Sequence, residues 1–240
     1  MLQARTDIGL VRATNQDVAL AERLPDGRSL LVAADGVGGI PGGEVASRTA
    51  VAALAGALHA AGDEPPAAAL HRAFATANDA VRVGQHGDLA RMSTTLVAAI
   101  VRDGMAWVAN LGDSRAYLVA DGEARQLTLD HSWVEEGIRS GELAPDDPLV
   151  ALNRHVITRA IGLDASAAVD VFGPIDVAPD SVLLLCTDGL HGVLDDRAIA
   201  DVIAASGGDY ASDLIDGVLA AGAPDNIGVA VLATQPGTRP

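Results

Sequence analysis

Short apolar segments joined by Asp-Gly turns constrain the fold of this chain more than any other feature of its sequence. The predicted strands lie in a hairpin at 17–35 and at 93–102, 105–112, 114–121, 155–160, 181–188 and 226–234. Pro25-Asp26-Gly27, Asp103-Gly104 and Asp121-Gly122 favour tight hairpin turns, because these residue types accept the backbone angles that such turns need. Successive strands are therefore expected to pair in an antiparallel way.

Helices are predicted in pairs, at 44–60 with 66–83 and at 195–206 with 209–221. A parallel βαβ arrangement would instead place single helices between successive strands. The order predicts an α+β fold with two sheets, and two stacked sheets flanked by helix pairs would accommodate it. No repeat, low-complexity tract or linker divides the chain, so residues 1–240 are expected to form one domain, with a mixed insertion at about 130–160.

Composition excludes several classes of protein. Arginine supplies all 16 basic residues against 32 acidic ones, and the net charge of −16 argues against binding to nucleic acid. Without lysine, the chain cannot use a P-loop, kinase or Schiff-base lysine. Its glycine-rich segment 35–44 does not fit a GxGxxG motif, because Pro41 takes the place of the third glycine. Cys186 is followed six positions later by Gly192, not by the arginine that a cysteine-dependent phosphatase needs.

The single cysteine also bears on the compartment. Cys186 alone cannot form an internal disulfide framework, which fits a reducing environment. The sequence has no apolar run near the roughly 20 residues that a membrane span needs, and its start does not resemble a signal peptide. We therefore predict a cytoplasmic protein without a membrane segment.

Four aspartates lie next to strongly predicted strands, namely Asp35, Asp113, Asp188 and Asp225. Any one of them could be a simple turn residue. If they converge at one end of a sandwich, their charges repel, since two unit charges 4 Å apart cost about 4 kcal/mol at an effective dielectric of about 20. A divalent cation would relieve this repulsion, and an all-oxygen site selects Mg²⁺, Mn²⁺ or Ca²⁺.

An ordered series of motifs then resembles a known family. The series is GLVRATNQD (9–17), DGVGG (35–39), GDSRA (112–116), CTDGL (186–190) and DNIGVAVL (225–232). Together these motifs are similar to those of the metal-dependent protein phosphatase (PPM, type 2C) family, in its bacterial serine/threonine form. The resemblance runs from about residue 7 to residue 234. It implies a four-layer αββα sandwich, with two antiparallel sheets flanked by helix pairs.

The resemblance implies two Mn²⁺ or Mg²⁺ ions. Asp35 corresponds to the carboxylate that bridges both ions, and Gly36 would bind one ion through its carbonyl group. Asp188 and Asp225 resemble the remaining ligands of the second ion. The implied reaction is hydrolysis of phosphoserine and phosphothreonine in proteins by a hydroxide that bridges the two metals.

Further residues have implied roles around this centre. Asp17 resembles an outer acid that holds metal-bound water, and Asp113 with Asp188 resembles a third, weaker metal site. Arg12 is similar to the arginine that grips the substrate phosphate, although a surface salt bridge is the plainer alternative. Arg159 resembles a residue near a flap, with simple structural pairing as an equal alternative.

The chain departs from the family pattern at two positions. Gln16 stands where an acidic residue is usual, which removes one charge from the metal shell. Val37 stands where many eukaryotic relatives have a histidine that is a proposed general acid. His131 and His191 are candidates for that role, although both fit structural roles better. Two further matches, Thr94 and Thr95, are expected to be mainly structural.

The predicted function is that of a phosphatase opposing a bacterial Ser/Thr kinase, with phosphorylated proteins as partners and a monomeric chain. The alternative from another class is a catalytically inactive relative that serves as a binding or regulatory module. A non-enzymatic calcium-binding protein would need a repeated loop, which is lacking here. The acidic segment 130–159 has the composition of a mobile flap beside the site, with a plain surface loop as the alternative.

Overall fold

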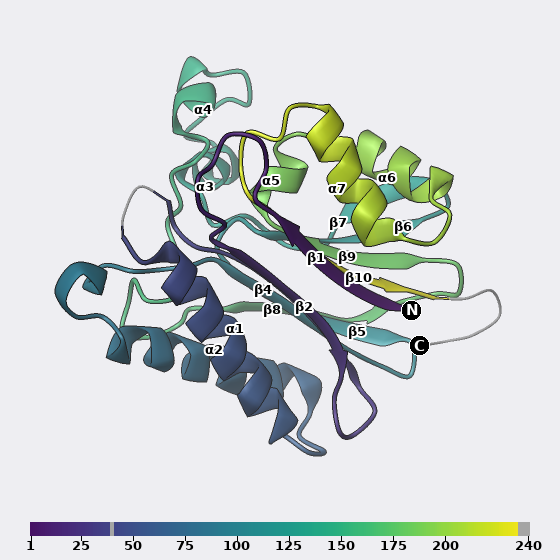
Figure 1. The fold of residues 1–240 in the computed structure, drawn as a ribbon, viewed down its shortest axis with the longest axis horizontal. Coiled ribbons are helices and arrows are strands. Elements are labelled where there is room, and N and C mark those ends of the chain that lie inside the picture. The colour runs from purple at the N-terminus through teal and green to yellow at the C-terminus, as the bar shows by residue number, and fades with distance from the viewer. Residues whose placement is uncertain (39–40, 235–240) are drawn as a thin grey trace.

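Two five-stranded antiparallel sheets are stacked on each other in the computed structural model, which describes residues 1–38 and 41–234 (Figure 1). One sheet has the order β1 (Leu2–Asp7), β10 (Ile227–Ala233), β9 (Val182–Cys186), β6 (Arg115–Ala120) and β7 (Glu123–Gln126). The other has the order β2 (Asp17–Arg23), β3 (Ser29–Asp35), β4 (Leu96–Arg102), β5 (Met105–Leu111) and β8 (Asp170–Asp176).

A pair of helices covers the outer face of each sheet (Figure 1). The pairs are α1 (Gly43–His59) with α2 (Pro66–Val83), against the β2–β8 sheet, and α6 (Asp196–Ala205) with α7 (Tyr210–Ala220), against the β1–β7 sheet. The remaining helical elements are η1 (Gly87–Leu89), α3 (Trp133–Ser140), α4 (Pro148–Asn153) and α5 (Asp188–His191). The predicted α+β sandwich of two antiparallel sheets flanked by helix pairs is thus confirmed. Within the described residues, no helix combines the length and hydrophobicity that crossing a bilayer requires.

Strand β3 shows why the central segments are apolar at every position. Leu30, Val32 and Ala34 pack toward α1 and α2, whereas Leu31 and Ala33 pack between the two sheets. Side chains of a strand alternate between its faces, so a strand that is covered on both faces has no place for an exposed residue. All five side chains are fully buried.

The antiparallel arrangement brings several acidic residues to one end of the sandwich. In the β2–β3 pair, Asp17 at the start of one strand lies opposite Asp35 at the end of the other. Asp188 follows β9, and Asp225 precedes its neighbour β10. Because these strands run in alternating directions, the start of one strand and the end of the next meet at the same edge.

Some predicted elements differ from the structure. Residues 155–160 do not form a strand, and their region makes only isolated bridges, Ser132 with Ile157 and Thr94 with Ile161. These partners lie in loops, so no neighbouring strand extends the pairing. Strands β1, β7 and β8 were not predicted, and all three lie at sheet edges. The sequences of β1 and β7 are rich in polar residues, and β8 is interrupted by Gly173-Pro174.

Candidate active site

The end of the sandwich contains a cavity of about 310 Å³. It is lined by Arg12, Gln16, Asp35, Gly36, Val37, Gly38, Thr95, Asp113, His155, Ile157, Asp188, Asp225 and Asn226. Arg12 and all the predicted metal ligands except Asp17 therefore lie on its wall. Asp17 is buried behind the wall, beside Asp35 across the β2–β3 pair.

Asp17 is held from the opposite sheet. The Thr187 hydroxyl donates to its Oδ2 atom over 2.7 Å, although the two residues are 170 positions apart. Its Oδ1 atom is buried and has no hydrogen-bond partner within the described residues. Burial raises the pKa of Asp17 to about 7, and the charges of Asp188 and Asp225 add to this rise.

Asp35 is fixed through its backbone by two threonines. Its N–H donates to the Thr95 hydroxyl over 2.9 Å, and its carbonyl oxygen accepts from the Thr95 N–H and the Thr94 hydroxyl, each over 2.8 Å. Thr94 and Thr95 thus position the strand end that carries this carboxylate. Burial raises the pKa of Asp35 well above its usual value, and the neighbouring charges of Asp17 and Asp188 raise it further.

Two glycines permit close approaches that bring the carboxylates together. A Cβ atom on Gly36 would lie 2.3 Å from the backbone of Gly43, where α1 begins. A Cβ atom on Gly189 would lie 1.8 Å from the carbonyl oxygen of Asn226. The second contact locks α5 against the start of β10, so that Asp188 and Asp225 become neighbours. Burial, followed by the charge of Asp225, raises the pKa of Asp188.

Asp113 lies where the chain crosses from β5 to β6, between the two sheets. The preceding Gly112 has a φ of +121° and lies against Thr95, which leaves no room for a side chain. Burial raises the pKa of Asp113 to about 7, and the charges of Asp188 and Asp130 contribute to the rise.

Both histidines that were candidate general acids make hydrogen bonds within the protein. His131 accepts from the Gly112 N–H at Nδ1 over 3.1 Å, so its Nε2 carries the proton and donates to Asp170 over 3.0 Å. His191 donates from Nε2 to the Asp113 carbonyl over 3.0 Å, and burial lowers its pKa to about 3. Both imidazoles therefore hold the Asp113 loop in place, which favours the structural interpretation.

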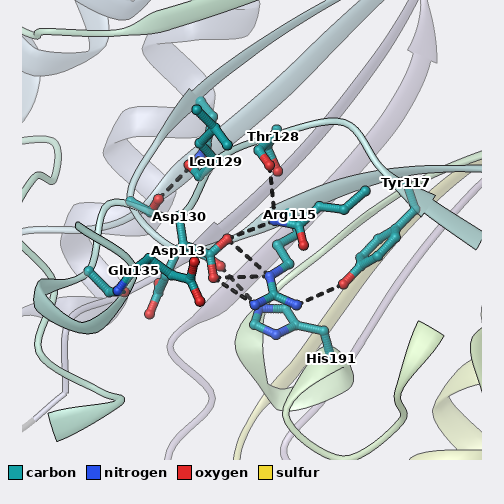
Figure 2. A network of polar contacts seen from close by, with 12 residues as sticks. Asp113, Arg115, Tyr117, Thr128, Leu129, Asp130, Glu135 and His191 are labelled. Carbon is teal, nitrogen blue, oxygen red and sulfur yellow. Dashed lines mark hydrogen bonds and ion pairs between the residues drawn. The ribbon is translucent and has the colours of Figure 1, made fainter. Parts of the chain in front are cut away.

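An ion pair lies directly beside Asp113 (Figure 2). Arg115 donates to both carboxylate oxygens of Asp130, with a shortest distance of 2.7 Å, and to the Tyr117 hydroxyl over 3.0 Å. Gln126 donates to the same Asp130 carboxylate over 3.0 Å. Because Arg115 is neutralised by Asp130, it leaves the charge of Asp113 largely uncompensated.

Arg12 lies at the open side of the cavity and is paired with one of the predicted metal ligands. Its guanidinium group is 2.6 Å from Oδ2 of Asp225, and 46% of its side chain is exposed. The other Asp225 oxygen accepts from the Asn226 N–H over 2.8 Å. Both oxygens of this carboxylate thus have protein partners, and a cation bound by Asp225 would compete with Arg12 for its charge.

The residues present suit hard divalent cations. Among residues 1–38 and 41–234, no three acidic, histidine or cysteine side chains are already arranged as a metal site. However, all the predicted metal ligands that line the cavity offer oxygen atoms, which hard divalent cations prefer. In addition, Oδ1 of Asp17 has no hydrogen-bond partner within the described residues. Carboxylates whose pKa values rise because they crowd together gain most from a cation that neutralises them.

Some of the residues that line the cavity were not predicted. His155 and Ile157 belong to none of the motifs, and Asn226 lies in the motif at 225–232 but had no predicted role. Arg159 does not line it. Its guanidinium group is 3.3 Å from Asp170 and 3.8 Å from Glu136, in agreement with the alternative of structural pairing.

The raised pKa values predict how the stability of the metal-free protein depends on pH. Asp17 and Asp113 have folded-state pKa values of about 7 against 3.8 normally, so the folded state binds more protons in this interval. The free energy of unfolding must therefore fall as pH rises toward and through 7. We expect the melting temperature in EDTA to decrease between pH 6.5 and about 8, by an amount that an Asp17→Asn variant reduces.

Other groups titrate in the same interval. The lowered pKa values of His131, His191 and the N-terminal amine of Met1 act in the opposite direction, because these groups bind protons more weakly in the folded state. They are unchanged in Asp17→Asn, so the difference in slope between this variant and the wild type isolates the contribution of the carboxylate. A melting temperature that rises over the same interval, or an Asp17→Asn variant with the same slope as the wild type, would contradict the assignment.

Known proteins that are similar to this chain identify its family. A profile of the protein phosphatase 2C family matches residues 11–207. The serine/threonine phosphatase stp of Listeria welshimeri is 34% identical over 205 residues, which cover 83% of this chain and 81% of that protein.

Solved structures of similar proteins have the same fold over nearly the whole chain. The PPM Ser-Thr phosphatase MsPP from Mycobacterium smegmatis, in complex with cacodylate, has a TM-score of 0.84 at 34% identity, with 98% of each chain covered. The catalytic domain of the serine threonine protein phosphatase PstP, in complex with two manganese ions, has a TM-score of 0.79 at 35% identity, with 96% of each chain covered. The chain belongs to the protein phosphatase 2C family. The predicted resemblance, and with it the prediction of a protein phosphatase, is confirmed.

Proposed function

We propose that this protein hydrolyses phosphoserine and phosphothreonine in cytoplasmic proteins, using Mn²⁺ or Mg²⁺, and so opposes a bacterial Ser/Thr kinase. The observation that carries the proposal is the convergence of Asp35, Asp113, Asp188 and Asp225 on one cavity, with Arg12 at its open side. A catalytically inactive relative would be expected to lack some of these residues, and none of the predicted set is missing. The buried, unpaired Cys186 supports a reducing compartment.

In the proposed site the carboxylates would hold the cations. Asp35, Asp188 and Asp225, with the Gly36 carbonyl, are the residues that would hold the first two, and Asp113 with Asp188 would hold a third. Bound cations supply Lewis acidity, which activates water and neutralises charge on the phosphate. Asp17, behind the wall, would orient water through its free oxygen atom.

The remaining groups act on the substrate. Arg12 is half-exposed at the open side of the cavity, so it could turn from Asp225 to a phosphate, for which its planar fork of donors is well suited. Val37 has no proton to give to the leaving oxygen of serine or threonine, and His131 and His191 are engaged elsewhere. That leaves water and the cavity-lining His155 as the groups able to protonate the leaving oxygen.

The proposed substrate class can be tested with three peptides of one sequence that carry phosphoserine, phosphothreonine or phosphotyrosine. With Mn²⁺ present, we expect phosphate release from the first two at rates well above the third. Release from none of the three would contradict the proposed function, and a clear preference for phosphotyrosine would contradict the substrate class.

Arg12→Ala is expected to raise the KM for a phosphothreonine peptide about 10-fold or more, because a charge-assisted hydrogen bond contributes about 1.5–3 kcal/mol. Arg12→Lys should recover only part of this, since an ammonium group cannot donate from two positions at once. Calorimetric titration with Mn²⁺ provides a second measurement. The affinity of Arg12→Ala for Mn²⁺ should equal or exceed that of the wild type, because Asp225 loses a competing partner.

Two results would count against these roles of Arg12. One is a lysine variant with wild-type kinetics, which would exclude a bidentate contact. The other is a weaker affinity of Arg12→Ala for Mn²⁺, which would mean that the Arg12–Asp225 pair supports the metal site.

A further inference from the structure

A second cavity of about 280 Å³ adjoins the candidate active site. The two cavities share four lining residues, namely Asp113, His155, Asp188 and Asp225. A peptide whose phosphate occupies the first cavity would therefore place a nearby side chain at the second. Apart from these four shared residues, none of the roles in metal or substrate binding derived above uses the lining of the second cavity.

Part of the second cavity is apolar. Val134 of α3, Val150 of α4, Val193 after α5 and Pro224 before β10 contribute to its lining. Val134 is buried, and Val150 and Val193 are half-buried. Such surfaces suit the methylene stem of a long side chain.

The charges around the cavity favour a cation. Its lining includes Arg115, but this guanidinium group is already bound by Asp130, as Figure 2 shows. Arg154 is exposed and donates to His155. The half-buried Glu135, in the first turn of α3, has no ion pair in the described part of the chain and lines the second cavity together with Asp113.

We propose that the second cavity binds the side chain of an arginine or lysine that flanks the phosphorylated residue of the substrate. The valines contact the methylene stem, and Glu135 binds the cationic group. Because Asp113, Asp188 and Asp225 are assigned to metal ions, Glu135 is the carboxylate left to select the charge. This inference rests on the proposed function and specifies its substrate class.

The test uses phosphothreonine peptides with glutamine at all flanking positions, and a set in which one flanking residue at a time is arginine. Glutamine keeps an extended polar side chain without the charge. For at least one position we expect the wild type to have a kcat/KM about 5-fold higher with arginine, the upper end for a partly exposed charge pair. Glu135→Gln should remove this preference while hydrolysing p-nitrophenyl phosphate at the wild-type rate.

Glu142→Gln is the matched control. It removes the same charge from the same segment, but Glu142 is exposed and does not line either cavity. This variant should keep the arginine preference. As a measurement that needs no variant, added salt should reduce the preference of the wild type, because it screens a partly exposed ion pair.

Three outcomes would contradict the proposed subsite. They are no arginine preference in the wild type, an arginine preference that survives in Glu135→Gln, or a loss of this preference in Glu142→Gln that equals the loss in Glu135→Gln. The failure of the proposed function is distinguishable from these, since the wild type would then release phosphate neither from p-nitrophenyl phosphate nor from any peptide.

Discussion

Asp35→Asn is expected to reduce phosphate release by about 10³-fold or more, the loss seen when a group that stabilises the transition state is removed from an enclosed site. Asp35 lies between Asp17, Asp113 and Asp188, whose charges all act on it, so its carboxylate is the one best placed to serve more than one cation. Calorimetric titration should show a matching loss of Mn²⁺ affinity. The measurements are steady-state hydrolysis of a phosphothreonine peptide and the heat of Mn²⁺ binding.

The melting temperature of the metal-free Asp35→Asn variant distinguishes a role of Asp35 in metal binding from a role in supporting the fold. In EDTA, Asp35→Asn should melt at a higher temperature than the wild type, because it removes one charge from a crowded group of carboxylates. Asp121→Asn is the control, since Asp121 lies in the β6–β7 turn with a φ of +53°, which asparagine accepts. A metal-free Asp35→Asn that is less stable than the wild type would show that this carboxylate supports the fold and not a metal site.

Gly189→Ala is expected to destabilise the protein by about 3 kcal/mol and to remove most of its activity. The new methyl group would lie 1.8 Å from the Asn226 carbonyl oxygen, and this neighbour is backbone, so α5 and the start of β10 must move apart. Asp188 and Asp225 lie on these two segments, so the shift should also weaken Mn²⁺ binding. Urea unfolding and Mn²⁺ titration measure the two effects.

Gly207→Ala is the matched control for this substitution. A Cβ atom on Gly207 would meet nothing within 4 Å, so its effect on stability should stay within about 1 kcal/mol. If Gly189→Ala were as stable and as active as Gly207→Ala, the close contact would not hold the two carboxylates together.

Local sequence was sufficient to predict much of the fold. The β2–β3 hairpin and the α1 and α2 helices follow from turn residues and alanine-rich composition, which act between near neighbours in the chain. Aspartates that directly follow or precede strands could likewise be proposed as a site, because antiparallel strands bring such positions to one edge. Asp35 and Asp188 are the plainest cases.

Contacts between distant segments could not be predicted from the sequence. Nothing in the local pattern places Thr187 against Asp17, Asn226 against Gly189, or Arg12 against Asp225. Each of these contacts depends on how the two sheets are stacked. Nor does the sequence show that β5 and β6 belong to different sheets, although only three residues separate them.

The segment at 155–160, HVITRA, was predicted as a strand but does not form one. Its backbone partners are single loop residues such as His131, whose carbonyl oxygen accepts from the Thr158 N–H over 2.8 Å. Local sequence says nothing about whether a neighbouring strand is available. His155 and Glu135 could not be identified as cavity residues, because their position depends on contacts with distant segments.

The most direct test of metal-dependent hydrolysis is phosphate release from a phosphothreonine peptide under three conditions: with Mn²⁺, after removal of metal by EDTA, and after Mn²⁺ is restored in excess of the chelator. We expect release with Mn²⁺, its loss in EDTA, and its recovery when Mn²⁺ is added back. Release that continues unchanged in EDTA, or that is absent with both Mn²⁺ and Mg²⁺, would contradict the account.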